Sequence, residues 1–161
     1  SNVVDDLIIV NDIQYQLSTL TIESTGGEDA VQAVIVPQSS AEAKTWFSNP
    51  KLVIPAPGIG KYVRITDAVG KYSFGTTPYT GGFGPYLKYV GTDPSAQICA
   101  FNNAFFYQAP NSRLFTGTSN ITNPVILLEN TGVELYTQTA NPANGDGTFI
   151  FLIKYSTPNI F

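Results

Sequence analysis

The chain has 161 residues, a length that suits one domain with an apolar core of its own. Charged residues make up only 12% of it, and the net charge of −4 leaves no basic surface for nucleic acid. Histidine is absent and Cys99 is the only cysteine. These counts exclude histidine-based catalysis, histidine-ligated metal sites, an intrachain disulfide and a redox pair of cysteines within the chain. Neither a membrane span nor a signal peptide is expected, because no long apolar run and no basic N-terminal stretch occurs.

Short runs of alternating apolar and polar residues, separated by Gly, Pro, Asn and Asp, predict an all-β protein. Near the N-terminus, the apolar runs 7–10 and 13–17 flank an Asn-Asp dipeptide that tolerates the backbone of a two-residue turn. We therefore expect residues 1–20 to form an N-terminal hairpin or arm and residues 21–161 to form a β-sandwich domain.

The rest of the chain predicts further strands and one short helix. The helix, of one or two turns, is expected within residues 40–47, with Ser40 as its N-cap. The longest strand is expected to change the face that it buries near Asp67, at a bulge. The expected strands cover residues 31–36, 51–54, 61–74, 85–90, 96–101, 104–108, 125–128, 133–137 and 148–155.

The last expected strand is apolar on both faces over its first half, since Ile150 and Leu152 alternate with a second apolar set. An exposed edge of this composition would invite aggregation, so the strand is expected to be central and buried, with a contribution to a subunit interface. The second set, the candidate core or oligomer strand, comprises Phe149, Phe151, Ile153 and Tyr155.

Six aromatic residues surround a glycine-rich segment, residues 75–84, that is expected to be a flexible surface loop. Their rings could stack on sugars, or they could fill the sandwich core and a subunit interface, and the second interpretation is favoured. These candidate interface or glycan-contact residues are Tyr72, Phe74, Tyr79, Phe83, Tyr86 and Tyr89.

Three patterns that can carry chemistry are weak in this chain. Residues 58–61 (GIGK) resemble part of a phosphate-binding loop, but that pattern needs glycine where Pro55 stands and serine or threonine where Tyr62 stands. Residues 141–147 resemble a calcium loop but hold a single carboxylate, so a solvated turn is expected there. No two acids are singled out as a catalytic pair, although Asp67 is the first to inspect. We therefore expect no catalytic residues, no metal and no cofactor.

Two segments of the chain resemble a known group of proteins. Residues 52–65 (LVIPAPGIGKYVRI), followed by Tyr72 and residues 75–82 (GTTPYTGG), are similar to a segment of small tailed-phage virion proteins. Residues 130–132 (NTG) and 145–155 (GDGTFIFLIKY) are similar to the closing strand of the same group. This resemblance implies a jelly-roll-like antiparallel β-sandwich and brings no catalytic residues with it.

The same resemblance implies a function without chemistry. The chain is expected to be a capsid decoration or cement protein on the virion surface, binding the major capsid protein and its own copies, as a trimer by analogy. The alternative is a receptor- or glycan-binding head-fibre or tail module, with the loop at 75–89 lining a groove. In either case no nucleic acid, membrane or substrate turnover is expected.

Overall fold

The computed structural model describes residues 21–22, 30–93, 96–102, 106–119 and 127–160, and the predicted N-terminal hairpin lies outside these ranges. The described elements follow the order β1 (Thr21–Ile22), β2 (Gln32–Gln38), α1 (Ser40–Ala43), β3 (Lys51–Ile54), β4 (Arg64–Ser73), β5 (Phe83–Tyr89), β6 (Gln97–Phe101), β7 (Arg113–Ser119), β8 (Val133–Gln138) and β9 (Thr148–Ser156). The described helix is too short to cross a membrane.

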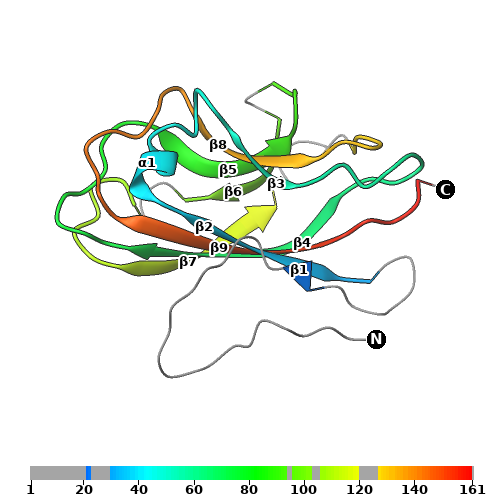
Figure 1. Ribbon diagram of the computed structural model, residues 1–161, viewed down its shortest axis with the longest axis horizontal. Coiled ribbons are helices and arrows are strands. Elements are labelled where there is room, and N and C mark those ends of the chain that lie inside the picture. The colour runs from blue at the N-terminus through cyan, green and yellow to red at the C-terminus, as the bar shows by residue number, and fades with distance from the viewer. Residues whose placement is uncertain (1–20, 23–29, 94–95, 103–105, 120–126, 161) are drawn as a thin grey trace.

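The strands form two facing layers with the connectivity of a jelly roll (Figure 1). One layer has the order β1-β2-β9-β4-β7 and the other has the order β6-β5-β8-β3. The pairs β2–β9, β3–β8, β4–β7 and β5–β6 are all antiparallel, as in one long hairpin folded over into two layers. This wrapped arrangement is a jelly roll. The prediction of an all-β, jelly-roll-like sandwich in a single domain is confirmed.

The two layers are joined along one side by β7. Its first half pairs with β4 in one layer, and its last residues, from Gly117 onward, pair with β6 in the other. A Cβ atom at Gly117 would lie 2.6 Å from Cys99 Sγ and 2.7 Å from the Phe101 ring. Glycine is therefore required where the strand passes from one layer to the other.

The core between the layers is mostly aromatic. Strand β9 lies between β2 and β4, which makes it a central strand. Phe149, Phe151, Ile153 and Tyr155 of this strand are all buried. The Phe149 ring lies 5.0 Å from the Tyr72 ring of β4 and 5.0 Å from the Trp46 ring, centroid to centroid. The Phe151 ring lies 5.4 Å from the Phe101 ring of β6, so rings from both layers and from the segment after α1 meet on this strand.

The helix differs from its prediction at its N-terminal end. It forms one turn, Ser40–Ala43, within the predicted range, but its N-cap is Ser39, not Ser40. The reason is a capping box: the Ser39 side chain accepts from the Glu42 backbone N–H, and the Glu42 carboxylate accepts from the Ser39 backbone N–H. If Ser40 were the N-cap, the side chain that accepts from its backbone N–H would belong to Ala43, which has no polar side chain.

The strand predictions are right for most of the described sheet. The register between β4 and β9 shifts between Ile65 and Asp67, which confirms the predicted bulge. Strand β7 was not predicted, because its sequence RLFTGTS does not alternate and contains a glycine. The described parts of the expected strands 104–108 and 125–128 are not strands, apart from an isolated bridge at Tyr107.

Candidate functional site

Three of the six candidate aromatic residues lie inside the sandwich. Tyr72, Tyr79 and Tyr89 are buried, and the hydroxyls of the last two donate to backbone carbonyls. The acceptors are Gly147 O at 2.7 Å for Tyr79 and Val63 O at 2.5 Å for Tyr89. Burial raises the pKa of Tyr79 and raises the pKa of Tyr89 to about 12. These rings hold the layers together and present no face to a ligand.

The other candidates lie nearer the surface. Phe74 is half-buried, with its ring edge-on to the Tyr72 ring at 6.5 Å. Tyr86 is half-buried and lies 5.6 Å from the Tyr136 ring on the neighbouring strand β8. The side chain of Phe83 lies outside the described set. The structure therefore does not bring the five described rings together into one binding surface.

The start of the glycine-rich segment is held by one carboxylate rather than being a free loop. Asp146 accepts hydrogen bonds from the backbone N–H of Thr76 at 2.8 Å and of Thr77 at 2.9 Å, and from the Thr76 hydroxyl at 2.6 Å. These hydrogen bonds lower the pKa of Asp146 to about 2. The turn that contains Asp146 thus fixes the position of a segment far away in the sequence.

The calcium-like turn, residues 141–147, uses its oxygens within the protein. Asn141 Oδ1 accepts from the backbone N–H of Phe47 and Ser48, at 2.9 and 3.1 Å. The Asp146 carboxylate is bound by the threonine segment described above. Among the described residues, no group of three or more Cys, Asp and Glu side chains could hold a metal ion.

The acids of the described chain also serve separate structural contacts. Asp67 forms an ion pair with Lys154 at 3.6 Å, and Glu134 forms a largely buried ion pair with Lys88 at 2.6 Å. The Lys88 ammonium also lies 5.2 Å from the centre of the Tyr136 ring. Each of these carboxylates is tied to a lysine, and the arrangement of paired acids needed for glycoside hydrolysis is not formed by them.

The described surface that is most suited to binding is the solvent-facing side of the β2-β9-β4-β7 layer. Alternate residues of each strand point away from the core here, and most of the central ones are aliphatic. We call this surface the outer face and define it by Ile35, Val69, Lys71, Leu114, Ile150 and Leu152.

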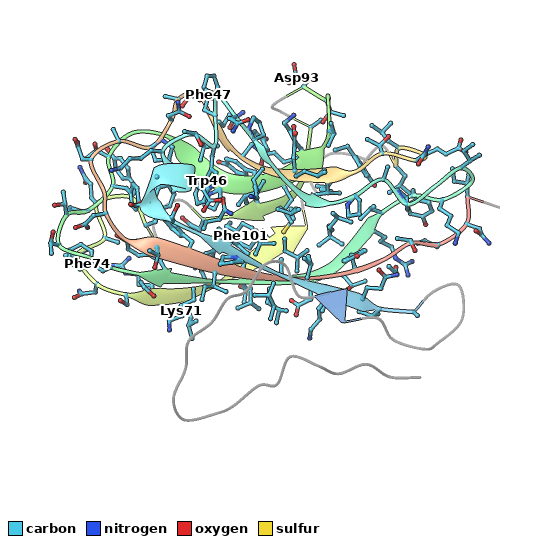
Figure 2. All side chains as sticks on the ribbon, in the orientation of Figure 1. Trp46, Phe47, Lys71, Phe74, Asp93 and Phe101 are labelled. Atoms are coloured by element: carbon cyan, nitrogen blue, oxygen red, sulfur yellow. The ribbon has the colours of Figure 1, made fainter. Side chains whose placement is uncertain are left out.

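Strand register brings the outer-face residues into neighbouring rows. Lys71 lies opposite Ile150 on one side and opposite Leu114 on the other, and Val69 lies opposite Leu152. Leu114 is 75% exposed and Ile150 is 43% exposed. Figure 2 shows Lys71 projecting from this layer away from the core. The outer face is therefore an apolar surface with one ammonium group in its middle.

The size of the outer face indicates a modest contact. Strands about 4.8 Å apart, with same-side residues about 7 Å apart along each strand, give two rows on the order of 300 Å² in area. An apolar patch of this size on a monomer is often a site of interaction with another molecule.

Part of this surface had a signal in the sequence and part had none. Ile150 and Leu152 stand out because they make the second face of the last strand apolar. Leu114 could not be found, because the strand that carries it was not predicted and its neighbours come from β4 and β9.

Comparison of the chain with known protein families, with curated proteins and with solved structures finds no match.

Proposed function

We propose that this chain is a non-catalytic structural module that joins protein surfaces, of the capsid decoration or cement type found on phage virions. The observation that carries the proposal is the outer face, where Leu114 and Ile150 are exposed on either side of Lys71. Such a face is suited to adhesion, because aliphatic area gives binding free energy at roughly 25 cal/mol per Å² without any chemical step.

The fold is consistent with this function by analogy. Jelly rolls are used in viral capsid and lectin domains, although a fold alone never fixes a function. The two segments that resemble small virion proteins include β3, the start of β4 and β9, which are strands of both layers. The support therefore comes from an architecture, a resemblance and an apolar face that favour the same role.

The rival function, glycan binding through the loop at 75–89, has less support. Tyr72, Tyr79 and Tyr89 are buried, so their rings have no free face for a sugar. Phe74 and Tyr86 remain half-exposed on different parts of the loop and its strand. Loss of cell attachment, with retention of the chain on particles, in a Tyr86→Ala variant would favour the rival.

Electron cryomicroscopy of phage particles assembled in the presence of this chain tests the proposal. We expect the protein on the outside of the shell, at positions repeated by the lattice. A Leu114→Asp variant is expected to detach from heated particles more readily than the wild type. The matched control is Phe47→Asp, which changes an exposed apolar residue on the far side of the molecule (Figure 2). Absence of the chain from the shell, or its presence only on the tail, would contradict the proposal.

A further inference from the structure

A second apolar feature lies at one end of the sandwich, in the loop that joins β3 to β4. Ile59 in this loop is 88% exposed, more than the other exposed large apolar residues of the described chain. Ile160, the last residue described, donates its backbone N–H to Gly60 O at 2.8 Å, which places the loop beside the C-terminal end (Figure 1). Ile59 is thus an aliphatic side chain held in solvent at a corner of the molecule.

This loop is held by side chains from another part of the chain. The backbone N–H of Gly58 donates to Asn130 Oδ1 at 3.0 Å, and the N–H of Gly60 donates to Glu129 Oε1 at 2.6 Å. Gly58 and Gly60 have φ angles of 103° and 79°, in the left-handed region that favours glycine. The position of Ile59 is therefore fixed from both sides by contacts that do not involve its side chain.

A rigid exposed aliphatic residue is suited to act as an anchor in a protein contact. Binding normally requires loops and side chains to lose conformational freedom, and a loop that is already held avoids most of that loss. In protein–protein interfaces, most of the binding free energy comes from a few residues that fill pockets on the partner. Because the loop does not need an isoleucine for its own hydrogen bonds, the side chain is free to serve a partner.

We propose that Ile59 of one copy docks on the outer face of a second copy, in a head-to-tail contact. The inference rests on the proposed function and names the partner of the same face. The chemistry of the two surfaces is complementary: Ile59 lies beside the Glu129 carboxylate, whereas Leu114 and Ile150 lie beside the Lys71 ammonium. Lys71 takes part in none of the ion pairs formed among the described residues.

A symmetric contact between two outer faces is less favourable. It would bring the Lys71 side chains of the two copies onto one apolar surface, and like charges across an interface oppose association. A head-to-tail contact uses two different surfaces, so each copy has one donor and one receiving surface. This difference makes the two arrangements separable by mixing variants.

The test uses the full purified chain in sedimentation velocity over a range of concentrations. The wild type is expected to self-associate, and Ile59→Asp or Leu114→Asp is expected to weaken association by about 10-fold or more. An equimolar mixture of the two variants is expected to form a dimer and nothing larger, because one intact Ile59 and one intact outer face remain. Phe47→Asp, the matched control, is expected to associate like the wild type.

Each other outcome overturns the inference. A wild type that stays monomeric at the highest soluble concentration, an Ile59→Asp variant that associates normally, or a variant mixture that stays monomeric excludes the head-to-tail contact. Circular dichroism of each variant establishes that the fold is kept. The result can be distinguished from that of the particle experiment. If the chain is found on shells but does not self-associate, only the head-to-tail contact is excluded. If the chain self-associates but is absent from shells, only the proposed function is excluded.

Discussion

The buried pair formed by Gln38 and Trp46 allows a quantitative test of how α1 is fixed to the sandwich. The two residues are 2% and 0% exposed, and the indole Nε1–H donates to Gln38 Oε1 at 2.9 Å. A Gln38→Leu substitution keeps the volume but removes the acceptor, which leaves the indole N–H buried without a partner. An unsatisfied group of this kind costs about 1–3 kcal/mol, so the free energy of unfolding should fall by that amount.

The companion variant, Trp46→Phe, removes the donor and also loses packing on Phe149 and Phe151, whose ring centroids lie 5.0 and 5.9 Å from the indole. Trp46→Phe therefore costs more than Gln38→Leu. In the double variant neither the indole nor the amide is left alone, so the combined loss should be about 1–2 kcal/mol smaller than the sum of the single losses.

Urea unfolding followed by far-ultraviolet circular dichroism measures all four proteins. Fluorescence is unsuitable for the full cycle because Trp46 is the only tryptophan. If the two losses add to within about 0.5 kcal/mol, or if Gln38→Leu is as stable as the wild type, the hydrogen bond does not hold the helix segment and the reasoning is refuted.

Three further predictions follow from single contacts. Hydrogen bonds lower the pKa of Asp146 from 3.8 to about 2, so its contribution to stability is present above pH 3.8 and is lost as the pH falls through 2. The Asp146→Asn variant should therefore have a lower thermal unfolding temperature than the wild type at pH 6, and the difference should be much smaller at pH 2. Gly70→Ala should cost about 1–3 kcal/mol in urea unfolding, since its methyl group would lie 1.8 Å from Phe115 Cζ, and a Phe115→Leu background should reduce that cost. Burial, followed by the charge of Asp67, raises the pKa of Cys99 to about 12, so a thiol reagent at pH 8 should react only as fast as the protein unfolds, and immediate reaction would show that the thiol is accessible.

The fold was predictable because alternation and turn residues act locally. Strand β9 illustrates this: its two apolar faces predict a central strand, and it pairs with β2 and β4. Strand β7 shows the limit. Its glycine at 117 weakens the strand pattern, yet the same glycine is needed where the strand crosses between layers against Cys99 and Phe101.

The candidate site was less predictable because burial depends on partners that are distant in sequence. Tyr72 lies just before the glycine-rich segment and Tyr79 lies within it, which suggests exposed rings as readily as buried ones. In the structure each ring packs on a remote glycine: a Cβ at Gly145 would lie 2.2 Å from the Tyr79 ring, and one at Gly147 would lie 2.5 Å from the Tyr72 ring. Only the folded turn of residues 141–147 brings these glycines to the tyrosines.

The two exposed apolar features also suit the proposed role, in which copies associate only weakly in solution and assemble on a shell. Stable interfaces bury about 800 Å² on each partner, whereas the outer face supplies on the order of 300 Å², so a single head-to-tail contact is weak. Copies bound to one lattice meet at an effective concentration that can reach the millimolar range, which is enough to make weak contacts form. Separating Ile59 from the outer face keeps either apolar surface small, and the side-chain hydrogen bonds that hold the loop retain the anchor ready for a neighbour.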